Sequence, residues 1–183
     1  MQKHIVIARF DDETDELFRQ WKKSAFNLQV NQYEDATLLP PHLTMAAFED
    51  MNPDDLCNWT CNYSKNSCTI DVKFSSLGVF AHGKNLDTDV IYIAPGNSMK
   101  LTEFYYNFHE KYDEFCGNYG WKYTAKYGHP VFHSTITICN ACEFNNVFDM
   151  LRDEFREISS KIVALEVYED PIKLICRYEL SGT

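Results

Sequence analysis

The sequence predicts an α+β protein whose sheets are mainly antiparallel. The first observation is the order of periodic segments, strand-helix-strand-helix-strand-strand in the first half and helix-strand-helix-strand-strand in the second. The second is that neighbouring strands are joined by short turns, at 85–89 and 169–171, which is typical of antiparallel pairing. The third is a His-x-Thr triplet that occurs once in each half, at 42–44 and 133–135.

The elements of the first half follow from apolar spacing and from residues that begin helices. Pro40 and Pro41 favour extended backbone just before one strand, and Asn52 is a typical helix N-cap with Pro53 at the first helical position. The expected elements are a strand at 4–10, a helix beginning in the acidic stretch 11–16, a strand at 42–48, a short helix at 52–61, and strands at 67–80 and 88–94.

The second half begins with a long periodic helix. Ser98 can cap it, and apolar residues recur at three- and four-residue steps until the chain nears Gly117, which can end a helix. The elements expected after it are a strand at 132–139, an acidic amphipathic helix at 143–157, and strands at 161–168 and 172–180.

Length and charge narrow the class of protein. A chain of 183 residues is long enough for one compact domain. It has 17 Lys and Arg against 27 Asp and Glu, so its net charge of -10 repels polyanions and we expect no long nucleic acid as a partner. No apolar run approaches the roughly 20 residues of a membrane span, and the first residues lack the apolar core of a secretory signal. We therefore expect a cytoplasmic protein outside membranes and, without a heptad pattern, a monomer.

Seven cysteines, an odd number, favour reduced thiols over a disulfide framework. Cys57 with Cys61, and Cys139 with Cys142, form two close pairs that could together present four thiolates to zinc. One pair is expected on a helix and the other at the end of a strand, so the favoured interpretation is thiols that behave as small apolar residues, without a metal.

The two His-x-Thr triplets present side chains suited to acid–base chemistry. Residues i and i+2 of a strand point to the same face, so His42 lies beside Thr44 and His133 beside Thr135. An imidazole can hold or release a proton near neutral pH, and a hydroxyl can donate a hydrogen bond to developing negative charge. Both triplets lie in apolar or β-branched runs preceded by proline, at equivalent places in the two halves. The alternative interpretation is two strand histidines without a catalytic task.

With these residues the sequence resembles the 2H phosphoesterases, including bacterial 2'-5' RNA ligase-like proteins and cyclic phosphodiesterases, whose signature is two His-x-Thr/Ser motifs. The stretches that carry the resemblance are 5–10 for the opening strand, 41–45 for the first motif, 74–80 and 90–95 for a central hairpin, 133–136 for the second motif and 163–169 for the closing strand. The family usually has proline directly before the second histidine, whereas Phe132 stands here, with Pro130 two places earlier.

The resemblance implies a bilobal, pseudo-duplicated 2H phosphoesterase fold. Two mainly antiparallel sheets would face a central cleft that contains both motifs, with helices outside. The whole chain, 1–183, would form a single domain whose pseudo-symmetric lobes span approximately 1–95 and 96–183.

The resemblance also implies an enzyme in which His42, Thr44, His133 and Thr135 are catalytic and no cofactor is needed. The implied activity is metal-independent cleavage of a 2',3'-cyclic phosphate or a 2'-5' phosphodiester in a nucleotide or short oligonucleotide, as in cyclic nucleotide phosphodiesterases and 2'-5' RNA ligase-like enzymes. Which histidine is the acid stays open, and the roles reverse in ligation. The alternatives are a non-catalytic module that binds a nucleotide or signalling oligonucleotide, and a hydrolase of another phosphorylated small molecule.

Further residues are expected to bind the substrate. The candidates for contacting phosphate are Arg9, Lys126 and Arg177, and the candidates for stacking on a base are Phe48, Tyr92, Tyr127, Phe80 and Tyr123. The competing interpretations are core packing for each aromatic and a solvated strand edge for each cation. Among the other histidines, only His129 lies near a motif, and His4, His82 and His109 are expected to be structural or exposed.

Overall fold

The computed structural model describes residues 2–30, 38–81, 87–124, 126, 131–170 and 172–182. Its strands are β1 (Lys3–Phe10), β2 (His42–Glu49), β3 (Ile70–Ala81), β4 (Thr88–Pro95), β5 (Ser134–Asn140), β6 (Ile158–Glu169) and β7 (Lys173–Glu179). Its α-helices are α1 (Asp12–Asn27), α3 (Pro53–Lys65), α4 (Met99–Phe108), α5 (Gly117–Gly120) and α6 (Phe144–Glu154), and the 3₁₀ turns η1 (Asp113–Phe115) and η2 (Trp121–Tyr123) flank α5.

The described strands pair antiparallel, in the order β2-β1-β6-β3-β4-β5. Opposite its β1 edge, β6 pairs with β3 through residues 158–162 and with β7 through residues 164–169. The two expected sheets are therefore one continuous sheet in which β2, β1, β6 and β7 form one part and β3, β4 and β5 the other. Each part takes strands from both halves of the chain, and the predicted α+β class is confirmed.

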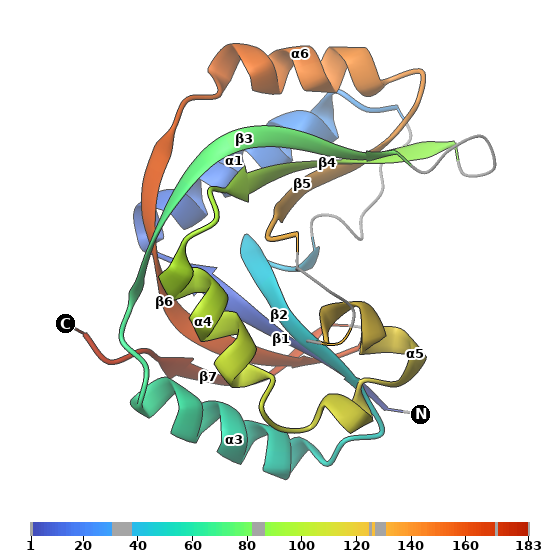
Figure 1. Ribbon diagram of the computed structural model, residues 1–183. Coiled ribbons are helices and arrows are strands. Elements are labelled where there is room, and N and C mark those ends of the chain that lie inside the picture. The colour runs from blue at the N-terminus through green and yellow to red at the C-terminus, as the bar shows by residue number, and fades with distance from the viewer. Residues whose placement is uncertain are drawn as a thin grey trace.

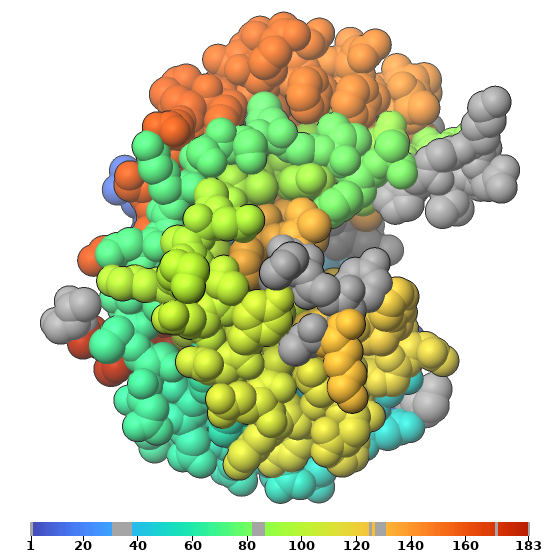
Figure 2. Space-filling model, viewed as in Figure 1, coloured from blue at the N-terminus to red at the C-terminus, as the bar shows by residue number. Residues whose placement is uncertain are grey.

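The sheet curls until its two ends meet. β2 and β5 lie at opposite ends of the strand order, yet they contact each other. Figure 1 shows the C-shaped ribbon that results, with α1 and α6 beside β3, β4 and β5, and with α3 and α5 beside β1, β2 and β7. In the space-filling view of Figure 2, α6 with β3 and β4 forms the upper part of the visible surface and α3, α4 and α5 the lower part.

The helices are held by caps and by apolar faces. Asp11 caps α1 by accepting a hydrogen bond from the Thr14 N–H at 2.9 Å. Phe18 of α1 stacks on Trp21 at 5.6 Å between ring centroids and meets Phe74 of β3 edge-on at 5.0 Å. These ring contacts pack α1 against the sheet. Within the described residues, no helix is long and apolar enough to cross a membrane.

The helix predicted over 98–117 is wrong in its second half, because α4 ends at Phe108. His109 explains the change: its Nδ1 lies 2.6 Å from an Asp113 carboxylate oxygen, and its Nε2 lies 2.8 Å from the carbonyl oxygen of Met45 in β2. Tyr112 then takes a φ of 68°, a left-handed conformation that a right-handed helix cannot contain. The chain therefore turns back over β2.

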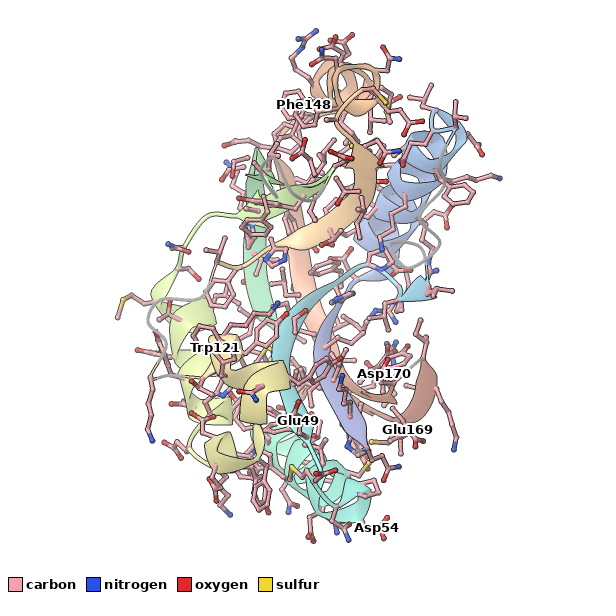
Figure 3. All side chains as sticks on the ribbon, turned by 90° about the vertical axis from the view of Figure 1, so that its right-hand side faces the viewer. Glu49, Asp54, Trp121, Phe148, Glu169 and Asp170 are labelled. Atoms are coloured by element: carbon pink, nitrogen blue, oxygen red, sulfur yellow. The ribbon has the colours of Figure 1, made fainter. Side chains whose placement is uncertain are left out.

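The outer edge of β2 is covered by the short helix α5. Glu49, at the end of β2, accepts a hydrogen bond from the Asn118 N–H at 3.2 Å, and Figure 3 shows Glu49 beside this helix. Gly120 comes so close that a Cβ there would lie 1.7 Å from the carbonyl oxygen of Ala47. Among the described strands β2 pairs only with β1, and the cover protects the other edge of this strand, which begins with His42.

Candidate active site

The two His-x-Thr motifs lie at the beginnings of the two end strands. His42 is the first residue of β2, and His133 immediately precedes β5. Both histidines and both motif threonines are half-buried, whereas Leu43 and Ser134 between them are 1% exposed. This alternation places each His and Thr on the same side of its strand. β2 and β5 contact each other, and the pKa of His42 is lowered by burial and also by the charge of His133, so the fold brings the two motif histidines together.

Both motif strands have a register irregularity at the same place. In β2, Thr44 and Ala46 pair with successive residues of β1, which leaves Met45 without a partner. In β5, Ile136 is left out of the pairing with β4 in the same way. Each of these residues comes three positions after a motif histidine. Such bulges bend a strand and redirect its side chains, and they are frequent beside active sites.

Both imidazoles are held through Nδ1. The Nδ1 of His42 lies 2.7 Å from the carbonyl oxygen of Pro40, and the Nδ1 of His133 lies 2.7 Å from that of Val131. A carbonyl oxygen can only accept a hydrogen bond, so Nδ1 carries the proton in each neutral ring. Nε2 is therefore the atom that can take up a proton, in both rings.

Burial disfavours the charged form of both imidazoles. Desolvation lowers the pKa of His42 to about 3, and the positive charges of Lys22 and Arg9 act in the same direction. Desolvation and the charge of Lys122 also lower the pKa of His133. Both rings are therefore neutral near pH 7 in the protein without ligand.

The sequence interpretation missed the two lysines beside the motifs. Lys122 lies in the turn η2, where no sequence pattern marks it. Lys22 is 6% exposed on α1 and follows Phe18 by four positions, so it occupies a core-facing site of the helix. A lysine at a buried helical position is the signal that could have identified it.

Two aromatic rings lie against His133. Tyr92 of β4 and Phe80 of β3 have centroids 4.3 Å apart, and these rings lie 5.3 Å and 4.9 Å from the imidazole. Both rings are half-buried. Tyr92 fits here because its cross-strand partner is Gly78, where a Cβ would lie 2.3 Å from the ring. The structure thus brings Tyr92 and Phe80 to the second motif.

Arg9 and Phe48 occupy positions that do not suit the contacts expected of them. Arg9 is 7% exposed and uses its guanidinium inside the protein, on Glu166, Asp15 and the carbonyl oxygen of Pro41. Phe48 is 1% exposed and belongs to the hydrophobic core, so its ring has no face open to a base. Packing and internal ion pairing explain both residues.

The other expected contacts lie elsewhere. Lys126 is exposed and lines a cavity of about 400 Å³ together with Trp121 and Thr124, without a motif residue among its described lining. Arg177 is paired with Glu166 at 2.8 Å. Tyr123 is half-buried and lies in η2. The remaining residues, Tyr127, His129 and His82, lie outside the described residues.

The described cysteines do not gather into the four-thiolate site that zinc would need. Cys57 of α3 has its Sγ 2.6 Å from that of Cys176 in β7, Cys139 is buried, and Cys142 is exposed. Over the described part of the chain, no group of three or more His, Cys, Asp or Glu side chains could hold a metal ion.

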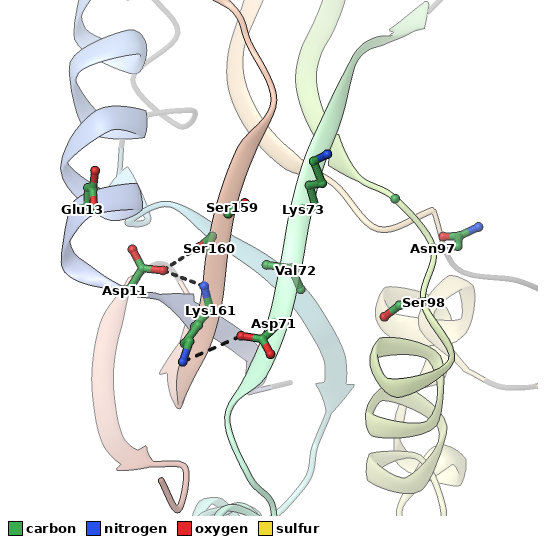
Figure 4. A pocket seen from close by; sticks show the side chains of 11 residues that line it. Asp11, Glu13, Asp71, Val72, Lys73, Asn97, Ser98, Ser159, Ser160 and Lys161 are labelled. Carbon is green, nitrogen blue, oxygen red and sulfur yellow. Dashed lines mark hydrogen bonds and ion pairs between the residues drawn. The ribbon is translucent and has the colours of Figure 1, made fainter. Parts of the chain in front are cut away.

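A larger cavity, of about 710 Å³, lies where β3 and β6 pair (Figure 4). Four of its polar side chains interact in pairs: Asp11 accepts from Ser160 at 2.9 Å, and Lys161 lies 3.8 Å from Asp71. None of the described residues that line it belongs to a His-x-Thr motif. The motif histidines, and not this cavity, therefore define the candidate site.

An antiparallel sheet that curls until its end strands meet has the fold of the 2H phosphoesterases. Solved structures of this fold superpose on the whole chain. TT0787 of Thermus thermophilus matches with a TM-score of 0.57 and 9% identity, covering 100% of this chain and 99% of that one. E. coli LigT complexed with 3'-AMP matches with a TM-score of 0.57 and 11% identity, covering 98% of both chains.

No protein-family model matches the sequence, and no curated protein matches it either. At identities of 9% and 11%, the structural likeness establishes the fold.

Proposed function

We propose that this protein is a phosphodiesterase that cleaves a 2',3'-cyclic phosphate or a 2'-5' phosphodiester in a nucleotide or short oligonucleotide. The observation that carries the proposal is the matched pair of imidazoles, His42 and His133, each with Nδ1 bound to a backbone carbonyl and Nε2 left for proton transfer. The ligand of the similar structure LigT, 3'-AMP, supports a small nucleotide as the ligand here.

The unequal environments of the two rings support a division of roles. His42, which burial keeps in the neutral form that can accept a proton, is the general base that takes a proton from the attacking water. The new P–O bond forms as the bond from phosphorus to the ribose oxygen breaks, and His133 protonates that leaving oxygen. The negative charge of the bound phosphate favours the protonated form of His133. Ligation would reverse these roles.

Thr44 and Thr135 complete the proposed site. Each lies on the same side of its strand as a motif histidine and is half-buried. Their hydroxyl groups would donate hydrogen bonds to the nonbridging phosphate oxygens, where charge accumulates in the transition state. This chemistry needs no metal or other cofactor.

Tyr92 and Phe80 form the proposed platform for the base. Their rings lie beside His133, and stacking of a base on an aromatic ring is worth about 1–3 kcal/mol. With a net charge of -10, the protein suits a small ligand better than a long nucleic acid. We place this activity in a single-domain, cytoplasmic monomer.

The test is a substrate panel measured in the presence of EDTA. We expect the wild-type protein to turn over 2',3'-cyclic nucleotides or 2'-5'-linked adenylates without metal, as followed by chromatography of the products. Calorimetric binding without turnover would instead indicate a nucleotide-binding module. Turnover of other phosphodiesters only would indicate a hydrolase of another small molecule. If the protein neither binds nor turns over any of these compounds, the proposal is contradicted.

A further inference from the structure

The three carbonyl groups that precede His42 are each bonded to a side chain. The Lys22 ammonium donates to the carbonyl oxygen of Leu39 at 3.1 Å, and the Nε of Arg9 donates to that of Pro41 at 3.1 Å. Between them, the Nδ1 of His42 donates to the remaining carbonyl at 2.7 Å. Two cationic side chains therefore flank the one carbonyl group that orients the imidazole.

This segment needs hydrogen-bond donors from elsewhere in the protein. Pro40 and Pro41 have no backbone N–H, so these two residues cannot be held by the reciprocal bonds that pair strands. Pro41 is also buried, and a buried carbonyl group without a partner is costly. Side-chain donors are the means by which this backbone is fixed.

Both donors are anchored in the core. Arg9 lies opposite His42 in the β1–β2 register and is 7% exposed. Its Nη1 lies 2.9 Å from both carboxylate oxygens of Glu166, and its Nη2 pairs with Asp15. Lys22, 6% exposed, projects from the buried side of α1. The position of the backbone before His42 is therefore set by β1, β6 and α1.

His133 is held less firmly. Val131, whose carbonyl oxygen it binds, is 57% exposed. Among the described residues, His133 itself is the only side-chain donor to that carbonyl group. Both histidines thus donate from Nδ1 to a backbone carbonyl group, but only the backbone before His42 is held by further described side chains.

We propose that Lys22 and Arg9 are positioning residues for His42. By holding the carbonyl groups of Leu39 and Pro41, they fix the backbone that binds the His42 Nδ1 proton, and so present Nε2 to the substrate in one orientation. The inference rests on the proposed function, because it assigns these residues to the general base of that reaction. Their charges serve the same end, since both lower the pKa of His42 and keep the ring neutral.

The test compares Lys22→Met, which removes the donor, with Lys22→Arg, which keeps one. The matched control is Lys23→Met, which removes the same charge from the next, exposed position of α1. We expect Lys22→Met to lower kcat by about tenfold to a hundredfold with little change in KM, because a misplaced base slows chemistry more than binding. Lys22→Arg should recover most of the loss, and Lys23→Met should match the wild type. Equal kcat values for Lys22→Met and Lys23→Met would overturn the proposal.

Arg9→Lys keeps a positive charge near Glu166 but removes the planar guanidinium that reaches Pro41. This variant is the alternative test if Lys22→Met does not fold. We expect this variant to lose kcat as well, with KM retained. A folded Arg9→Lys protein with wild-type kcat would overturn the role assigned to Arg9.

Nitrogen NMR of the imidazoles separates this inference from the proposed function. In the wild-type protein, His42 should be the tautomer protonated on Nδ1, whether or not a substrate is turned over. Lys22→Met should raise the pKa of His42 and mix the two tautomers, because it removes a nearby positive charge and loosens the Leu39 backbone. An unchanged His42 signal in Lys22→Met would overturn the inference, whereas absence of turnover in the wild type would contradict only the proposed function.

Discussion

His42 and His133 donate the same hydrogen bond, from Nδ1 to the carbonyl oxygen two residues earlier in the chain, at 2.7 Å in each case. The bond selects the same tautomer in both rings and leaves Nε2 for proton transfer. The rings differ in surroundings, because the backbone before His42 is held by two buried cations while Val131 before His133 is exposed. In the proposed reaction, these unequal surroundings suit one ring to act as the base and the other as the acid.

The pH dependence of kcat/KM follows from the lowered pKa values. His42 stays neutral down to about pH 3, so its protonation does not slow the reaction between about pH 5 and 8. The proposed acid, His133, must be protonated, and its lowered pKa makes that form scarcer as the pH rises. We therefore expect kcat/KM to fall with increasing pH over this range and to show no loss on the acid side. A rate that falls between about pH 7 and 5 would contradict the assignment of His42 as the base.

Gly78→Ala tests the aromatic platform without touching a motif. The new Cβ would lie 2.3 Å from the Tyr92 ring, which must then move away from Phe80 and His133. We expect KM for nucleotides to rise several-fold with a smaller change in kcat, as measured by steady-state kinetics. Gly96→Ala is the control, because its Cβ would meet a side-chain oxygen at an ordinary 3.6 Å. Wild-type KM in Gly78→Ala would remove Tyr92 from the substrate site.

Gly120→Ala tests the cover over β2. A Cβ at this position would lie 1.7 Å from the carbonyl oxygen of Ala47, and a strand backbone cannot move aside as a side chain can. We expect the free energy of unfolding to fall by about 1–3 kcal/mol or more, as measured by urea denaturation. Gly182→Ala meets nothing within 4 Å and should be neutral. Equal stability of the two variants would show that α5 does not pack on β2 as described.

The buried imidazole of His4 lowers the stability of the folded protein, and a substitution can remove this cost. Its ring is fully buried in β1 and neither ring nitrogen has a hydrogen-bond partner in the described part of the chain. We expect His4→Leu to raise the free energy of unfolding by about 1–3 kcal/mol. Burial lowers the pKa of His4 below 6.5, so below that pH the unfolded chain binds a proton that the folded chain does not. The wild type should therefore lose stability as the pH falls below about 6.5. The difference in free energy of unfolding between His4→Leu and the wild type should grow from pH 7.5 to 5.5 in urea denaturation, and a constant difference would contradict this explanation.

Much of the fold could be predicted because local patterns and tertiary structure agree. The Asn52 cap, which accepts from the Asp54 N–H at 2.8 Å, and the His-x-Thr alternation lie where the sequence places them. The second part of the helix predicted over 98–117 could not be predicted, since its end depends on a bond from His109 to Met45 across 64 positions. The curl of the sheet depends on similar long-range pairing between β3 and β6.

The sequence predicts the two motifs of the candidate site but not the residues that hold the backbone beside them. The His-x-Thr spacing, the apolar runs around it and its occurrence in both halves single out His42 and His133, because a strand repeats every two residues. The position of Arg9 depends on a buried carboxylate, Glu166, that is 157 positions away. No pattern in the sequence links these two residues, so Arg9 resembled a phosphate ligand until the fold placed its guanidinium inside the protein.

The most direct test of the account is the rate of 2',3'-cyclic nucleotide hydrolysis, with EDTA present, by His42→Ala, His133→Ala and the double variant, each confirmed to be folded by circular dichroism. If the two imidazoles act in one proton-transfer step, each single substitution lowers kcat by about 10²–10⁴-fold, and the double variant is hardly slower than either single variant. A folded single variant that retains wild-type kcat would contradict the two-histidine mechanism.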